Sequence, residues 1–301
     1  LHLLYARFWT RALKHIGKLD VAEPFASLFT QGMVTHETYS REEDGRTVYF
    51  SPGEVNRSGD GAVLVADGAP VEIGRVIKMS KSKKNVVDPD EIVAKYGADA
   101  VRWFMLSDSP PERDLPWSEA GIEGCWRFVQ RLWRLFAQYD AAATGEDKAI
   151  DRKAHQTVHA VAQDIEALGF NKAVARIYEL TGAIEKAAPS ASRSAAIRAL
   201  LLLVSPMMPH LAEEAFAHFG EGLVADAAWP AVDPALLIDD EVTVAVQVKG
   251  KLRDTLTVPK GTAREELERL ALASDKVQRA LDGAEVKKVI VVPDRLVNLV
   301  A

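Results

Sequence analysis

A lysine-rich segment has the residue types and the spacing for binding phosphate groups. Its core reads Lys78-Met79-Ser80-Lys81-Ser82, and two further lysines follow directly. Most lysine runs are simply solvated. Here the lysines alternate with hydroxyl groups and lie between a strand-like Val76-Ile77 and a helix expected to begin near Asp88. Ammonium and hydroxyl donors beside a helix N-terminus suit phosphate oxygens, so the segment is predicted to bind a phosphorylated ligand.

The elements around this segment are predicted from periodicity and from turn residues. Asp88 can cap a helix that starts at Pro89, so a helix is expected over 89–96. Before the lysines, short β-type runs alternate with glycine-rich turns and predict a β insertion over about 36–74. An amphipathic helix is expected over 3–16, where the apolar pattern stops at Gly17.

Beyond Trp117 the sequence predicts a helical bundle followed by a small α/β domain. Helical periodicity covers residues 119–143, 151–168, 171–187 and 193–219. From Glu241 the period drops to two, with Lys249-Gly250-Lys251 as a turn. Thr262 is expected to open a helix with a capping box, and Val289–Val292 is expected to be a buried strand. Three domains are predicted, over residues 1–117, 118–236 and 237–301.

Composition excludes several classes of protein. The 301 residues include 37 lysines and arginines against 43 aspartates and glutamates, and this net charge of −6 argues against nonspecific coating of nucleic acid. The single cysteine, Cys125, excludes an internal disulfide framework and a multi-cysteine zinc site, and a cytoplasmic location is expected. No apolar run approaches the ~20 residues of a membrane span, and the first residues are not expected to be a signal peptide.

The segment Lys78–Ser82 resembles the KMSKS signature of class I aminoacyl-tRNA synthetases, and all five letters match. Five further segments resemble the leucyl members of this family, and they are residues 2–9, 28–34, 110–117, 209–214 and 246–254. The resemblance therefore covers nearly the whole chain. The sequence starts without methionine inside a periodic segment, so we expect a chain cut within a domain. The resemblance then implies a C-terminal part of such an enzyme.

The resemblance implies an α/β plus all-α fold: the C-terminal half of a Rossmann-type catalytic domain with its β insertion, a helical anticodon-binding-type bundle, and a small C-terminal α/β domain. In this family the KMSKS loop closes over ATP, bound with Mg²⁺, while leucine is activated as an adenylate for transfer to tRNA. The catalytic role falls first to Lys81 and then to Lys78. Ser80 and Ser82 are expected to donate hydrogen bonds, and Met79 is expected to pack the loop.

The family's second catalytic motif, His-x-Gly-His, has no counterpart here. The nearest segment, His15-Ile16-Gly17-Lys18, lies where a helix is predicted to end, and Lys18 replaces the second histidine. A helix C-terminus with a glycine and basic residues explains it better. The leucine pocket and the editing domain are therefore expected outside this chain, and the chain alone is expected to be inactive.

Two basic clusters are predicted to contact tRNA. Arg127, Arg131 and Arg134 share one face of the first bundle helix, while Phe128, Leu132 and Phe136 are expected to face inward. Near the last hairpin turn, the cluster consists of Lys249, Lys251 and Arg253. On pattern alone the first face could be merely solvated, and the second cluster could protect an edge strand by its charge.

Other interpretations are weaker. A tRNA-binding module without catalysis would not need an intact lysine loop, and a nucleotide-dependent ligase acting on another small molecule would not explain the bundle and tail. A synthetase for valine, isoleucine or methionine shares the mechanism. No metal is predicted, because His155 and His159 have no obvious third ligand. The acidic run Asp239-Asp240-Glu241 is expected to be a solvated linker.

Overall fold

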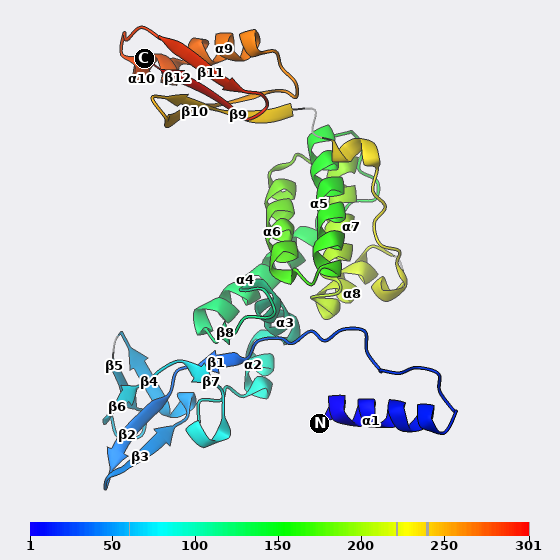
Figure 1. Cartoon of the computed structure of the whole chain (residues 1–301), viewed down its shortest axis with the longest axis vertical. Helices are drawn as coiled ribbons and strands as arrows, with labels where there is room; N and C mark the ends of the chain where they lie inside the picture. The colour runs from blue at the N-terminus through cyan, green and yellow to red at the C-terminus, as the bar shows by residue number, and fades with distance from the viewer. Residues whose placement is uncertain (60, 221, 239–240, 301) are drawn as a thin grey trace. The chain divides into compact units, whose positions relative to one another are not determined.

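The computed structural model describes residues 1–59, 61–220, 222–238 and 241–300 (Figure 1). Two compact units divide the chain, Leu1–Ala231 and Val232–Ala301. Each unit has its own buried residues. Of the acidic run predicted as a linker, Asp239 and Asp240 lie outside the described residues.

A short mixed sheet lies at the base of the lysine loop in the first unit. Strand β1 (Val34–His36) runs parallel to β8 (Leu115–Pro116) and antiparallel to β7 (Ile77–Lys78). Earlier in the chain, α1 (His2–His15) ends where the sequence predicted, and Gly17 has the left-handed φ of +70° that glycine tolerates. The segment His15–Lys18 is therefore a helix C-terminus, as expected.

The β insertion is a five-stranded antiparallel sheet in the order β3-β2-β6-β5-β4 (Figure 1). Its elements are β2 (Tyr39–Glu43), β3 (Arg46–Phe50), the 3-10 turn η1 (Pro52–Glu54), β4 (Val55–Ser58), β5 (Gly61–Leu64) and β6 (Pro70–Ile73). The chain enters and leaves this sheet side by side, because Gly74 donates its N–H to the carbonyl of Thr38 at 2.7 Å. A Cβ at Gly74 would lie 2.3 Å from Thr38 Oγ1, so any other residue would require the Thr38 side chain to move.

Two helices follow the lysine loop, α2 (Pro89–Tyr96) and α3 (Ala98–Ser107). The predicted start of α2 is confirmed, because the Asp88 side chain accepts a hydrogen bond from Asp90 N at 2.9 Å and Pro89 is the first helical residue.

The bundle contains five helices within the described residues, one more than the sequence predicted. They are α4 (Glu119–Phe136), α5 (Lys148–Glu166), α6 (Phe170–Lys186), α7 (Ala191–Val204) and α8 (Pro209–His218), followed by the 3-10 turn η3 (Val224–Asp226). The prediction of one helix over 193–219 was wrong, because Pro206 and Pro209 interrupt it and Pro209 starts a new helix. The first predicted helix also ends earlier, at Phe136.

Helix α3 binds both ends of the turn between α7 and α8. Arg102 donates to the carbonyls of Pro206 at 2.8 Å and of Met207 at 3.0 Å. Asp99 is only 7% exposed and accepts hydrogen bonds from His210 Nδ1 at 2.9 Å and from Leu211 N at 2.6 Å. These side chains replace hydrogen bonds that helix ends cannot make internally, and they tie α3 to the bundle.

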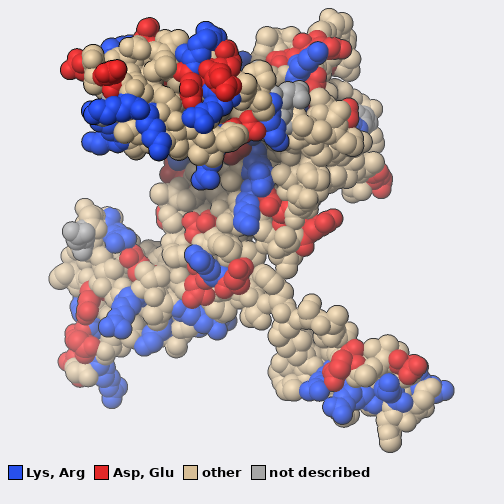
Figure 2. Space-filling view, turned by 45° about the horizontal axis from the view of Figure 1, so that its top comes forward, with Lys and Arg blue, Asp and Glu red and all other residues tan. Residues whose placement is uncertain are grey.

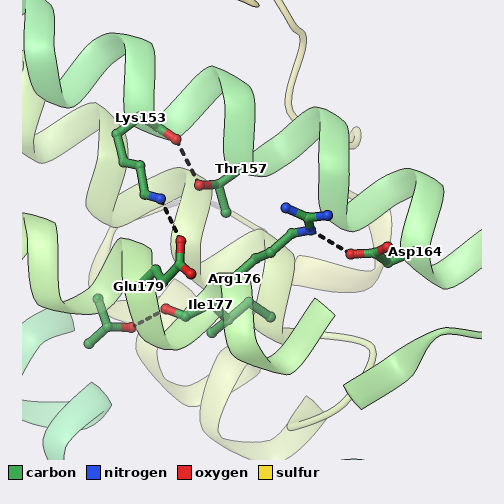
Figure 3. A network of polar contacts seen from close by, with 7 residues as sticks. Lys153, Thr157, Asp164, Arg176, Ile177 and Glu179 are labelled. Carbon is green, nitrogen blue, oxygen red and sulfur yellow. Dashed lines mark hydrogen bonds and ion pairs between the residues drawn. The ribbon is translucent and has the colours of Figure 1, made fainter. Parts of the chain in front are cut away.

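Two ion pairs connect α5 and α6 beside their buried apolar side chains, and Figure 3 shows these ion pairs. Lys153 Nζ lies 2.7 Å from Glu179 Oε2, and Arg176 Nε lies 2.6 Å from Asp164 Oδ2. Exposed pairs of this kind contribute about 0–1 kcal/mol each. The buried side chains therefore carry most of the stability of the bundle; among them are Leu132, Ile177, Leu180, Ile197, Leu200 and Leu203.

The second unit is a four-stranded sheet in the order β10-β9-β12-β11, with two helices (Figure 1). Its elements are the 3-10 turn η4 (Pro234–Leu237), β9 (Glu241–Val248), β10 (Lys251–Pro259), α9 (Arg264–Ala273), α10 (Asp275–Leu281), β11 (Lys288–Val292) and β12 (Leu296–Val300). Alternate residues Val244, Val246 and Val248 are buried, and Leu267 and Val277 of the helices belong to the same apolar cluster.

Two local predictions in this unit were wrong and one is confirmed. Thr262 forms no capping box: Ala263 is the N-cap, and the Thr262 hydroxyl donates to the carbonyl of Pro259 at 2.5 Å. The strand over Val289–Val292 exists, but it is not buried, because β11 is an outer strand of the sheet and Ile290 is 40% exposed. The turn at Lys249-Gly250 is confirmed, and both residues have the positive φ of a two-residue hairpin turn.

None of the helices in the described part of the chain is long and apolar enough to cross a membrane.

Candidate active-site loop and nucleic-acid-binding surfaces

The five residues Lys78–Ser82 run from the end of β7 into the 3-10 turn η2 (Lys81–Lys83). Ser80 is the N-cap of η2: its Oγ accepts a hydrogen bond from Lys83 N at 3.3 Å and lies 3.2 Å from Ser82 Oγ. Met79 continues the strand pairing, because its N–H donates to the carbonyl of Val34 at 3.2 Å. The predicted phosphate-binding residues are thus brought together on one tight turn.

Asn85 fixes the base of this turn, and the sequence prediction missed it. Its side chain is completely buried. Its Oδ1 accepts the backbone N–H of Ser80 at 2.9 Å, while its Nδ2 donates to the carbonyls of His36 at 3.1 Å and Ile77 at 3.3 Å. One amide therefore connects the loop to β1 and β7. The signal in the sequence was an asparagine directly between a lysine run and the apolar pair Val86-Val87.

The last two lysines of the run contact the β insertion. Lys83 Nζ donates to the hydroxyl of Tyr49 at 2.7 Å and lies 4.2 Å from the centre of the Tyr49 ring. Lys84 Nζ lies 4.0 Å from Glu54 Oε2, and the pKa of Glu54 is lowered, mainly because its carboxylate accepts the backbone N–H of Ser51. These two ammonium groups are already engaged inside the chain.

Lys78 and Lys81 differ from Lys83 and Lys84. Both side chains are exposed, and within the residues that the structure describes neither forms an ion pair. Exposed ammonium groups on a turn can bind a phosphate chain without first breaking an ion pair. The geometry thus divides the lysine run into two available and two engaged cations.

A cavity of about 1010 Å³ lies beside the loop rather than at Lys78 and Lys81. Four carboxylate residues line it, against the cationic Arg57 and Lys95; they are Glu37, Asp88, Glu91 and Glu119. A cavity with this surplus of acidic groups disfavours a phosphate anion. We therefore place no phosphate in it.

The arginine face of α4 exists, but two of its three guanidinium groups are paired. Arg127 Nη1 lies 2.8 Å from Glu123 Oε1, and Arg131 Nε lies 2.7 Å from Glu185 Oε1. This second hydrogen bond lowers the pKa of Glu185 and raises that of Arg131. Arg134 forms no ion pair within the described ranges, although its charge also lowers the pKa of Glu185. Phe128, Leu132 and Phe136 are buried, as predicted.

The second basic cluster is exposed on the β9–β10 hairpin. Lys249 lies in the turn, Lys251 begins β10, and Arg253 sits at a β-bulge, where the register shifts between Leu252 and Asp254. A bulge adds an unpaired residue and re-aims its side chain. Figure 2 shows lysine and arginine side chains gathered in separate groups on the visible face of the second unit, with acidic side chains between them.

Asp254, directly after the bulge, is held by α10. It accepts hydrogen bonds from Lys276 Nζ at 2.8 Å and from Ser274 Oγ at 2.5 Å. The bond from Lys276 is the main reason that the pKa of Asp254 is lowered to about 2. The carboxylate that follows the basic cluster is thus already neutralised by Lys276.

Among the residues that the structure describes, no group of three histidine, cysteine, aspartate or glutamate side chains is arranged to hold a metal ion. Cys125 is buried, and burial raises the pKa of its thiol.

Comparison with known protein families gives two matches, one that includes the lysine loop and one that includes most of the bundle. Residues 67–118 match the family of class I tRNA synthetases for isoleucine, leucine, methionine and valine. Residues 147–269 match the anticodon-binding domain of tRNA ligases, so this match extends from the bundle into the second unit.

Curated tRNA ligases match the chain over nearly its whole length. It is 86% identical to the leucine–tRNA ligase of Novosphingobium aromaticivorans over 303 residues, which cover 100% of this chain and 36% of that protein. It is 68% identical to the leucine–tRNA ligase of Sphingopyxis alaskensis, covering 99% of this chain and 36% of that protein. The chain thus spans about a third of the length of these relatives.

A solved structure is similar as well. The crystal structure of an Agrobacterium radiobacter K84 LeuRS in ternary complex with tRNA and LeuAMS matches with a TM-score of 0.66 and 29% sequence identity, covering 100% of this chain and 36% of that one.

Proposed function

We propose that this chain, which belongs to the class I tRNA synthetases as a segment of the leucine–tRNA ligase type, supplies the ATP-binding loop and the tRNA-binding surfaces for joining leucine to its tRNA. One observation carries the catalytic part of the proposal. Lys78 and Lys81 are exposed without an ion pair in the described residues, on a turn whose base the buried Asn85 fixes.

The reaction begins when a carboxylate oxygen of leucine attacks the α-phosphorus of ATP. The bond between the α-phosphorus and its bridging oxygen breaks, and pyrophosphate leaves with the electron pair. Negative charge grows on this leaving group in the transition state, so a lysine that binds it mainly then raises the rate more than the ATP affinity. Lys81, in the 3-10 turn itself, takes this role first, and Lys78 takes it second.

The hydroxyls support the same step. The Ser80 Oγ accepts a hydrogen bond from Lys83 N and shares a second hydrogen bond with the Ser82 Oγ at 3.2 Å, so one of the two hydroxyl protons stays available. Either hydroxyl can donate to a phosphate oxygen, while Met79 packs the loop. The Mg²⁺ of this reaction arrives with ATP as part of the nucleotide complex.

In the second step the terminal ribose hydroxyl of tRNA attacks the carbonyl carbon of leucyl-adenylate and AMP leaves. For this step we propose two surfaces on the chain. Arg134, with Arg127 and Arg131 after exchange of their carboxylate partners, contacts the sugar-phosphate backbone. The hairpin cluster Lys249, Lys251 and Arg253 contacts the tRNA elbow.

The domain boundaries follow from the same proposal. Residues 1–117 form the second half of a Rossmann-type catalytic domain, which the parallel pair β1 and β8 supports. Residues 118–236 form the anticodon-binding-type bundle, and residues 237–301 form the tRNA-binding α/β domain. Because relatives are almost three times as long, we expect the chain alone to be inactive. We place the protein in the cytoplasm, where tRNA is charged.

A hybrid enzyme tests this function. In it, the present chain replaces the matching segment of the Novosphingobium aromaticivorans leucine–tRNA ligase. We expect the hybrid to exchange pyrophosphate into ATP in the presence of leucine, and the isolated chain to be inactive. Exchange with valine, isoleucine or methionine instead of leucine would show that leucine is not the amino-acid substrate. A hybrid that binds tRNA without any exchange would indicate a non-catalytic tRNA-binding module.

A further inference from the structure

In the described part of the chain, the β insertion makes two polar contacts with the lysine loop, and they are to Lys83 and Lys84, the two residues after Ser82. Tyr49 of β3 accepts a hydrogen bond from Lys83 Nζ at 2.7 Å, and Glu54 of η1 pairs with Lys84 at 4.0 Å. The first contact is the shorter, and the ammonium also lies 4.2 Å from the ring centre. Tyr49 therefore holds Lys83 by a hydrogen bond and a cation–π contact.

The turn that carries Lys81 is short and held at both ends. Lys81 and Lys83 belong to the same three-residue 3-10 turn, so a displacement of Lys83 displaces Lys81. Lys84 has a left-handed φ of +49°, which a lysine adopts only when its surroundings enforce it. On one side Asn85 fixes this turn to the sheet, and on the other Tyr49 fixes it to the insertion.

We propose that Tyr49 is a positioning residue for leucyl-adenylate formation: through Lys83, the β insertion sets where the Lys81 ammonium meets the leaving pyrophosphate. The inference rests on the proposed function of the loop. A misplacement of about 1 Å can reduce a rate by up to about 100-fold, so a contact two residues from the acting lysine is close enough to matter. The proposal also gives Lys83 the role of holding the loop rather than of binding phosphate.

Two substitutions in the hybrid enzyme separate the two parts of the contact. Tyr49→Phe removes the hydroxyl and keeps the ring, and Tyr49→Leu removes both. We expect kcat for leucine-dependent pyrophosphate exchange to fall about threefold to tenfold in Tyr49→Phe, the effect of removing one hydrogen bond, and further in Tyr49→Leu. The KM for ATP should stay within about twofold, because the lysine acts mainly in the transition state.

Thr47→Val is the matched control. Thr47 lies two residues before Tyr49 on the same strand, and its hydroxyl bonds Glu42 inside the insertion at 2.5 Å. The control should keep the kcat of the unmodified hybrid. An equal reduction in Thr47→Val would show that any disturbance of the insertion has this effect, and it would overturn the assignment to Tyr49.

A double substitution tests whether Tyr49 acts through Lys83. We expect Lys83→Met combined with Tyr49→Phe to be no slower than Lys83→Met alone. Independent reductions that multiply would contradict the proposal, and so would full kcat in both Tyr49 variants. These failures would leave the proposed function standing, since the unmodified hybrid would still exchange with leucine. An unmodified hybrid without exchange would contradict the function itself.

Discussion

The backbone N–H of Ser80 donates to Oδ1 of Asn85 at 2.9 Å, so a buried amide fixes the residue that caps the 3-10 turn η2. The same side chain donates to two carbonyl groups, those of His36 and Ile77. Only an amide supplies an acceptor and two donors from one group. The lysine loop is thus connected to the sheet through a side chain that itself has no charge to offer a nucleotide.

Replacing Asn85 by aspartate in the hybrid enzyme should slow adenylate formation. The carboxylate keeps the acceptor for Ser80 but loses both donors and faces the carbonyls of His36 and Ile77 in a buried site. Leaving such groups unsatisfied costs about 1–3 kcal/mol, so we expect pyrophosphate exchange to fall by about 10-fold to 100-fold. Asn56→Asp on the exposed strand β4 is the control. Full activity of Asn85→Asp would contradict this role.

Arg134→Ala should weaken tRNA binding more than Arg131→Ala. Arg134 forms no ion pair among the described residues, whereas Arg131 must first leave Glu185. We plot the logarithm of the tRNA association constant against the logarithm of the salt concentration. The slope of this line should be smaller in magnitude by about 1 for each phosphate that is no longer bound. Arg176→Ala, which removes a guanidinium paired with Asp164, should leave the slope unchanged. A slope unchanged in Arg134→Ala would remove this face from the tRNA interface.

Alanine at Lys249, Lys251 and Arg253 together should impair aminoacylation while sparing adenylate formation. The three side chains are exposed in the second unit, which contains no part of the lysine loop. We expect a higher KM for tRNA and unchanged leucine-dependent exchange. Arg269→Ala on α9, which removes an arginine paired with Glu266, should change neither activity. Equal reductions in exchange and in aminoacylation would refute the elbow assignment.

The hydrogen bonds of Asp254 with Lys276 and Ser274 should make the second unit sensitive to acid. The folded-state pKa of about 2 lies below the ordinary value of about 3.9, so the stabilisation is present above pH 4 and disappears as the pH falls towards 2. Asp254→Asn should therefore lower the unfolding temperature of the second unit, measured by calorimetry at pH 6. The difference in unfolding temperature between the variant and the unmodified protein should disappear near pH 2. A difference that does not depend on pH would contradict this linkage.

Patterns along the sequence predicted most of the elements that position the loop. Periodicity identified the buried face of α4, because Phe128, Leu132 and Phe136 repeat at helical spacing. Capping chemistry located the start of α2 at Asp88. The apolar run before Phe219, in contrast, concealed the break between α7 and α8, since both helices are rich in buried residues and only Pro206 and Pro209 mark the boundary.

The contacts that hold the loop could not be predicted, because they join residues far apart in the chain. Asn85 bonds the carbonyl of His36, 49 residues earlier, and Lys83 bonds Tyr49, 34 residues earlier. In the sequence alone, the four lysines of the run are chemically alike. Only the position of the insertion distinguishes Lys78 and Lys81 from Lys83 and Lys84. For the same reason, the pairing of Arg131 with Glu185 was invisible in the periodicity of α4.

The most direct test of the catalytic role of the loop is single-turnover formation of leucyl-adenylate by the hybrid enzyme with Lys81→Ala. If Lys81 acts on the leaving pyrophosphate, the rate at saturating ATP should fall by at least about 100-fold, while the Kd for ATP should change by less than about threefold. Lys18→Ala, at an exposed lysine after α1, is the control and should change neither. An unchanged rate in Lys81→Ala would remove Lys81 from catalysis and contradict the account.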